Sequence, residues 1–476
     1  MSLAPELPKT APSTPPPAGP PGRRQPTSGA GALLLRLHFY AGVLVAPFIV
    51  VAALTGLLYT VVPQLDAVVY RQELFVDAVG DQPRPLAEQI AAARAAHPDG
   101  TLTSVTTPAA PDRTTEVVFS LPELGEKSHT VYVDPYTAVV RGQLVTWFGS
   151  TPVTTWIDDL HRNLHLGDLG RHYSELAASW LWVVALGGVV LWWRRSRGRR
   201  FLVPDLKARK GVRRTRGWHA AVGVWLLAGL LVLSATGLTW SRYAGGNFGS
   251  ALDVLDARTP QVSTSLTGAP AVSGGHHGAA PVAVEVDPAD ADTVLGVARD
   301  AGLSGPVTVT PPAEATSAWR VGQVDQVWPT RSDVVAVDPS AGTVTDRVDH
   351  ADWPVLAKLT SWGILVHMGV LFGVANQIVL AALAVGLLCV TFWGYRMWWQ
   401  RRPTKDGRRA LVGAAPARGA WDSAPTWLIL VGVPVSIAVG LALPLLGVSL
   451  LGFLVVDVVV GLLRSRRART GAPTAS

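Results

Sequence analysis

Four of the eleven histidines stand at repeated positions in or beside apolar runs of the chain. His38 and His219 are 181 residues apart, and His161 and His367 are 206 residues apart. A six-coordinate haem iron takes two axial ligands on opposite sides of the porphyrin, and two helices of a bundle can supply one histidine each. The pattern therefore predicts two b-type haem sites, one ligated by His38 and His219 and the other by His161 and His367.

Small residues repeat together with these histidines. Gly42 and Gly223 each follow a histidine by four residues, and a Thr-Gly pair at 55–56 recurs at 236–237. Residues four apart share one face of a helix, so the two glycines leave room for a flat macrocycle beside the imidazole. The Thr-Gly pairs lie further along the same helices and are also compatible with close approach.

Other readings of the histidines stay open from the sequence. A histidine at the end of a span is often interfacial, with its ring hydrogen-bonded to headgroups or carbonyls. His161 and His165 are four residues apart and could together chelate a transition metal. His165 also competes as the haem ligand, because a shift of 202 residues aligns it with His367. That shift loses the match between the tryptophan pairs at 192–193 and 398–399, so the sequence favours His161.

Five long apolar runs must position these side chains. A span needs about 20 apolar residues. Four runs have the length of single spans, and the fifth, with Pro444 near its middle, predicts a two-helix hairpin, for six spans in all. Eighteen tryptophans, many at the ends of these runs, fit a protein in contact with the lipid bilayer. The runs are Leu37–Val62, Leu176–Trp193, Trp218–Trp240, Ile364–Trp393 and Leu428–Leu463.

The net charge of +7 is concentrated beside the spans. Eleven lysines and arginines lie between Arg194 and Arg216, and further clusters follow at 396–409 and 464–469. Short basic loops stay in the cytoplasm, so both termini are predicted to be cytoplasmic in a multi-pass protein of the cytoplasmic (inner) membrane. Because the clusters flank spans so regularly, the basic charge sets topology and does not indicate a nucleic-acid partner.

The two long segments between spans repeat as well. Residues 132–135 and 336–339 share a Val-Asp-Pro sequence, and each is preceded by a helical pattern, at 85–97 and at 289–301. Alternating stretches at 115–121 and 307–310 predict strands. Each segment is therefore predicted to be a small extracytoplasmic α+β unit. The lone cysteine, Cys389, permits no disulfide within the chain, so these units depend on core packing.

The predicted class is a membrane all-α bundle of four core helices plus a C-terminal hairpin, with two extracytoplasmic α+β domains. Its parts are a disordered cytoplasmic tail (1–32), span one (33–62), the first outer domain (63–172), span two (173–195), a basic loop (196–217), span three (218–241), the second outer domain (242–360), span four (361–399), a cytoplasmic loop (400–425), the hairpin (426–463) and a cytoplasmic tail (464–476).

The motifs together resemble a known family. The stretch LHRNLHLGDLGR, from Leu160 to Arg171, leads into a span that ends in LWWRR. With the histidine-then-glycine openings of spans one and three and the Val-Asp-Pro segments, it is similar to the PepSY-associated transmembrane proteins, over residues 33–402. That family includes iron-regulated membrane proteins and inner-membrane ferric-siderophore reductases.

The resemblance implies two PepSY-like outer domains and, for a reductase member, two b haems. The iron ligands would be His38, His219, His161 and His367. Electrons would come from a cytoplasmic reductase or a membrane quinol and would reach an outer acceptor such as a ferric siderophore. Whether the chain is an enzyme of this kind, a haem-dependent ferric reductase, stays open.

Two rival functions follow from the same features. PepSY-like domains also occur beside peptidases, so the chain could be a non-enzymatic envelope sensor or peptidase regulator. A transporter is disfavoured because the repeats are parallel and carry no broken helix with an ion site. The sequence contains no Walker loop, no Gly-x-Ser-x-Gly motif and no dinucleotide fingerprint.

Overall fold

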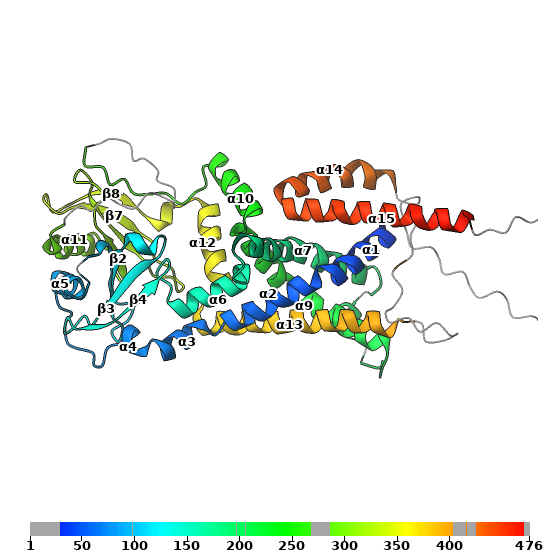
Figure 1. Cartoon of the computed structure of the whole chain (residues 1–476), viewed down its shortest axis with the longest axis horizontal. Coiled ribbons are helices and arrows are strands. Elements are labelled where there is room, and N and C mark those ends of the chain that lie inside the picture. Colours follow the sequence, from blue (N-terminus) through cyan, green and yellow to red (C-terminus); the bar gives the residue numbers. More distant parts are fainter. Residues whose placement is uncertain are drawn as a thin grey trace, which may run out of the picture.

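The computed structural model describes residues 29–97, 99–196, 198–204, 206–267, 286–402, 416 and 425–470. Most of the predicted tail at 1–32 and of the predicted loop at 400–425 lies outside these residues. A β-sheet forms one end of the molecule and long helices form the other (Figure 1). The end of the helical part next to the sheet is called the sheet side, and the opposite end is called the distal side.

The sheet has eight antiparallel strands in the order β4-β3-β2-β1-β5-β6-β7-β8. Each half is a four-stranded meander, and the halves join where β1 pairs with β5, with Val105 opposite Val309. The two predicted domains therefore share one continuous sheet, because each leaves its first strand free to pair with the other. The strands are β1 (Thr101–Thr106), β2 (Thr115–Ser120), β3 (Ser128–Val133), β4 (Val140–Thr146), β5 (Val307–Thr310), β6 (Trp319–Gln323), β7 (Val334–Asp338) and β8 (Thr343–Val348).

Two helices cover one face of this sheet, α5 (Leu86–Ala96) and α11 (Pro288–Asp300). Both were predicted from the helical periodicity, and Ile90 and Val294 are completely buried in the shared core. The Asp292 carboxylate of α11 accepts hydrogen bonds from the backbone N–H groups of Leu86 and Ala87, at 2.6 and 3.0 Å. These groups have no partner within α5, so the second repeat caps a helix of the first.

The first span is a bent pair, α1 (Gly29–Leu44) and α2 (Ala46–Tyr59), whose axes differ by 56°. Pro47 lacks the N–H that would bond to the carbonyl of Val43 four residues earlier. The Tyr395 hydroxyl donates to that carbonyl instead, at 3.0 Å. The bend thus has a local cause, and a neighbouring helix satisfies the carbonyl that the proline leaves free.

Four described helices are long and apolar enough to cross a membrane, or five if the bent pair counts as one span. They are α7 (Gly167–Trp193), α9 (Val212–Thr239), α13 (Gly373–Gln400) and α15 (Pro444–Thr470). The first arm of the predicted hairpin, α14 (Thr426–Ala442), is a shorter apolar helix of 17 residues. The described chain therefore supports four or five spans in place of the predicted six.

The predicted second and fourth spans are each preceded by a separate helix. A short helix α6 (Pro152–Asn163) comes before α7, and α12 (Val355–His367) comes before α13 and runs across its direction (Figure 1). Gly167 and Gly373, which the 206-residue shift aligns, both have left-handed backbone angles, with φ of 56° and 55°. Such angles suit glycine and turn the chain sharply, so the apolar run from Ile364 to Trp393 is not one continuous helix.

The C-terminal helices pack against the bundle through polar contacts. Arg36 and Asp457 form an ion pair whose side chains are only 5% and 15% exposed. The Trp180 indole N–H donates to the Ser449 hydroxyl at 2.8 Å. The remaining short elements are α3 (Val62–Val69), α4 (Arg71–Leu74), η1 (Pro122–Leu124), α8 (Arg199–Leu202), α10 (Tyr243–Val254) and η2 (His350–Asp352).

Candidate functional site

The four repeated histidines meet as two pairs. His38 on α1 and His219 on α9 have ring centroids 6.3 Å apart. His161 on α6 and His367 at the end of α12 have ring centroids 6.4 Å apart. These are the pairings that the sequence predicts. His38 with His219 is called the distal pair, and His161 with His367 is called the sheet-side pair.

Each ring of the distal pair is oriented by a backbone carbonyl. His38 Nδ1 lies 3.1 Å from the carbonyl oxygen of Val184, and His219 Nδ1 lies 2.8 Å from that of Val390. A carbonyl oxygen only accepts, so Nδ1 must carry the proton in both rings. The lone pair is thereby left on Nε2. Val184 and Val390 are 206 residues apart, so the duplication repeats the orienting group together with the ligand.

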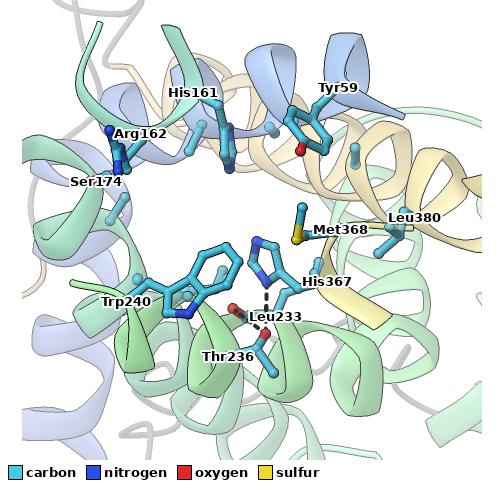
Figure 2. A pocket seen from close by; sticks show the side chains of 18 of the residues that line it. Tyr59, His161, Arg162, Ser174, Leu233, Thr236, Trp240, His367, Met368 and Leu380 are labelled. Carbon is cyan, nitrogen blue, oxygen red and sulfur yellow. Dashed lines mark hydrogen bonds between the residues drawn. The ribbon is translucent and has the colours of Figure 1, made fainter. Parts of the chain in front are cut away.

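Threonine hydroxyls orient the sheet-side pair. His161 Nδ1 lies 2.9 Å from Thr55 Oγ1, and His367 Nδ1 lies 2.7 Å from Thr236 Oγ1, as Figure 2 shows for His367. The Thr55 and Thr236 hydroxyls donate to the carbonyls of the residues four positions earlier, at 2.9 and 2.7 Å. A hydroxyl has a single proton, so each must accept from the imidazole N–H. These rings therefore also have the proton on Nδ1 and the lone pair on Nε2.

Repeated glycines let these rings approach the neighbouring helices. A Cβ on Gly188 would lie 2.9 Å from Cε1 of His38, and one on Gly394 would lie 3.6 Å from Cε1 of His219. At the sheet-side pair, a Cβ on Gly56 would lie 3.2 Å from the His161 ring. The sequence alignment finds these glycines as repeats, but it does not reveal that each of them contacts a histidine.

The glycines predicted to leave room for a macrocycle do have open space beside them. No atom lies within 4 Å of the position that a Cβ would take on Gly42 or Gly223, among the residues described. Both glycines lie one helical turn from a histidine of the distal pair. A flat group beside those rings would meet no side chain at these two positions.

A mostly apolar cavity of about 200 Å³ surrounds the sheet-side pair. Figure 2 shows the His367 ring pointing toward His161, with Thr236 behind it and Trp240 beside it. Further along the wall are aliphatic side chains of several helices, and the charged side chains of Asp158, Arg162 and Arg171 line one side. The two arginines lie within the stretch from Leu160 to Arg171 but could not be recognised as cavity residues without the structure.

His165 lies apart from the pair. Its backbone is left-handed, with φ of 55°, and its ring packs on Trp156 with centroids 4.9 Å apart. Helix α6 ends at Asn163, so His161 and His165 do not share a helical face. Within the described ranges, no group of three or more histidine, cysteine, aspartate or glutamate side chains could hold a metal ion. The geometry therefore favours His161 over His165 as the partner of His367.

One of two comparisons with known proteins found a match. No curated protein matches the sequence. The family model described as the PepSY-associated TM region matches residues 35–401. That stretch contains both histidine pairs, the whole sheet and the spans from the second half of α1 to α13, while the C-terminal helices α14 and α15 follow it. The chain therefore belongs to the family of PepSY-associated transmembrane regions.

Proposed function

We propose that the chain is a b-haem protein that carries electrons across the cytoplasmic membrane through two bis-histidine sites. One haem would be held by His38 and His219 and the other by His161 and His367. The observation that carries the proposal is that the duplication repeats the whole ligand environment, including the histidines and the groups that orient them.

The spacing of the rings suits this ligation. An imidazole nitrogen binds a transition metal at about 2 Å, so two axial imidazoles on one ion have ring centroids about 6 Å apart. The distal and sheet-side pairs, at 6.3 and 6.4 Å, match that separation. Histidines that merely met at a helix interface would have no reason to adopt the same separation twice.

The protonation of the rings suits it as well. Metal-ligating histidines usually donate their second ring N–H to a carbonyl or other oxygen, which fixes the tautomer and raises ligand basicity. In all four rings Nδ1–H makes such a bond, and no Nε2 of the four makes a hydrogen bond to any residue in the described part of the chain. Each Nε2 lone pair is therefore available to an iron.

The two sites lie at different depths along the bundle. His219 and Thr236 are both on α9, and their 17-residue separation corresponds to about 26 Å along the helix. This is nearly the thickness of the hydrocarbon core. Bound haem supplies one-electron redox chemistry at each depth. The protein would contribute the ligands, their orientation and, around the sheet-side pair, a mostly apolar lining.

The proposal includes a direction. The basic segment between Arg194 and Arg216 would lie in the cytoplasm, so the distal pair would take electrons there from a cytoplasmic reductase or a membrane quinol. The sheet-side pair would face the extracytoplasmic space and reduce an acceptor such as a ferric siderophore. Reduction to Fe(II) weakens binding by hard oxygen ligands and would release the metal.

A reduced-minus-oxidised visible spectrum of the purified full-length protein tests the proposal. We expect a b-type spectrum with two haems per chain. His161→Ala and His367→Ala should each remove the sheet-side haem, whereas His38→Ala should remove the distal one. The matched control is His165→Ala, which should keep both because that ring packs on Trp156.

Protein that folds and binds no haem under haem-sufficient expression would refute the proposal. That result would favour the alternative, a non-enzymatic PepSY membrane protein that regulates a peptidase or senses the envelope. Deleting the sheet would then change proteolysis in the envelope and leave electron transfer unaffected.

A further inference from the structure

The two halves of the sheet-side site have matching ligands but different rims. The 206-residue shift that aligns His161 with His367 also aligns Arg162 with Met368 and Arg171 with Gln377. Figure 2 shows Arg162 on one side of the two histidine rings and Met368 on the other. Among the described lining residues, the charged ones are Arg162, Arg171 and Asp158, all from the first half of the chain, so the cavity has a net positive charge on that side only.

Arg171 is the rim cation without an acidic partner. It donates to the backbone carbonyl of Trp240 at 2.9 Å, and it makes no salt bridge within the described ranges. The nearby Glu175 carboxylate is occupied by the backbone N–H groups at 243 and 244, each at 3.0 Å. Arg162 and Arg242 lie close enough to repel the charge of Arg171, and the carboxylates of Asp168 and Glu175 lie close enough to attract it. Because neither carboxylate forms an ion pair with Arg171, its guanidinium can still take an anion from the cavity.

Arg162 is held at the same rim by its neighbours. Its guanidinium lies 3.1 Å from Asp159 and 3.6 Å from Asp158, and it stacks over the Trp147 ring at 4.7 Å. These contacts fix its position and leave it lining the cavity. Arg242, by contrast, pairs with Asp168 at 2.7 Å and does not line the cavity.

We propose that Arg171, assisted by Arg162, binds the anionic substituents of an otherwise apolar macrocycle held between His161 and His367. For an iron protoporphyrin these substituents are its two propionates. The propionates would point to the arginine rim, and the vinyl edge would point to the Met368 side. This inference rests on the proposed function, since it gives the orientation of the sheet-side haem.

The proposed orientation of the macrocycle has an electrostatic reason. A guanidinium binds a carboxylate through paired, charge-assisted hydrogen bonds, which are about twice as strong as neutral ones. The opposite side offers the Met368 thioether, and Gln377, the neutral counterpart of Arg171, does not line the cavity. A carboxylate turned toward that rim would find no cation there.

The test is a binding titration of the haem-depleted full-length chain with two probes, iron protoporphyrin IX and its dimethyl ester. The protein carries His219→Ala so that only the sheet-side site is titrated. Arg171→Gln should weaken binding of protoporphyrin IX roughly 10- to 100-fold, the loss expected for a charged hydrogen bond. It should leave binding of the ester unchanged, because the ester carries no anion.

A redox titration supplies a second readout. Loss of a nearby positive charge favours Fe(III), so Arg171→Gln should lower the one-electron reduction equilibrium constant about tenfold, which is 59 mV. Arg171→Lys retains the positive charge, so its reduction potential should stay close to that of the unaltered chain. This variant replaces Arg171→Gln in the comparison if the glutamine variant does not fold. The matched control is Arg258→Gln, which removes an exposed arginine that pairs with Asp253 away from the cavity and should leave protoporphyrin IX binding unchanged.

The outcomes separate this inference from the proposed function. Equal weakening of both probes by Arg171→Gln would show a structural effect and overturn the assignment, as would no weakening of either. If the chain with intact Arg171 binds neither probe through His161 and His367, the proposed function itself fails. Selective loss of protoporphyrin IX binding supports both.

Discussion

Thr236→Val is the most direct test of the orienting network around the sheet-side pair. Valine matches threonine in shape but replaces the hydroxyl with a methyl group. His367 Nδ1–H would lose the Thr236 hydroxyl, the acceptor that now lies 2.7 Å away. The ring would then either keep an unsatisfied N–H or rotate away from His161.

The magnitude follows from that single bond. A buried donor without an acceptor costs about 1 to 3 kcal/mol. If this cost falls on the haem-bound state, the affinity for haem drops roughly 5- to 150-fold. Loss of outer-shell partners of metal-ligating histidines elsewhere costs 10- to 100-fold. Thr55→Val should act similarly through His161.

The assay is transfer of haem from the full-length protein to an excess of a haem-scavenging globin, followed by visible absorbance. We expect one of the two haems to leave faster in Thr236→Val while the distal haem serves as an internal control. Thr236→Ser restores the hydroxyl and should restore retention. The reasoning is refuted if Thr236→Val holds both haems as tightly as the unaltered chain, or if both leave faster together.

Three further perturbations have defined outcomes. Gly188→Ala should disturb the distal haem spectrum, because its Cβ would lie 2.9 Å from the facing imidazole, whereas Gly394→Ala, with 3.6 Å available, should be tolerated. Asp457→Asn leaves the buried Arg36 without its ion pair and should cost about 3 to 5 kcal/mol, seen as a lower Tm in detergent that a second change, Arg36→Met, partly recovers. Burial raises the pKa of Glu116 from 4.5 to about 7, so its protonated form is favoured in the folded protein. The contribution of Glu116 to folding stability should therefore be fully present below pH 4.5 and fall by at most about 3 kcal/mol as the pH rises through 7, and Glu116→Gln should abolish that fall in a comparison of Tm at pH 5 and pH 8.

The candidate ligands could be found from sequence because duplication marks them. A histidine that recurs with its flanking glycine and Thr-Gly pair at a constant shift stands out from the other histidines without any structure. The sequence favours His161 over His165 only through the match of the tryptophan pairs, and a second shift keeps His165 as an alternative. The choice depends on where α6 ends and on the left-handed turn at 164–165, and both are set by packing against α2 and α7.

The extent of the sheet could likewise not be predicted from the sequence. The strand patterns and the helices α5 and α11 are local and were predicted correctly. The pairing of β1 with β5 joins residues about 200 positions apart, and an exposed strand edge carries no local signature of its partner. Two units that read as separate domains thus form one sheet.

The sequence alone determined the properties that follow from amino-acid composition and from periodic or repeated patterns. These are the membrane spans, the internal duplication, the two α+β segments and the four histidines that pair. Tertiary structure decided the properties that need distant groups to meet. It joined the two outer segments, set α6 and α12 apart from the spans that follow them, and assigned the imidazole protons through the carbonyls of Val184 and Val390 and the hydroxyls of Thr55 and Thr236. It also gave one side of the cavity a net positive charge, since Arg162 and Arg171 line that side together with Asp158. The physical reason is that periodicity in the sequence reports only which face of a helix or strand is buried. A hydrogen bond or an ion pair depends on which distant residues packing brings against that face.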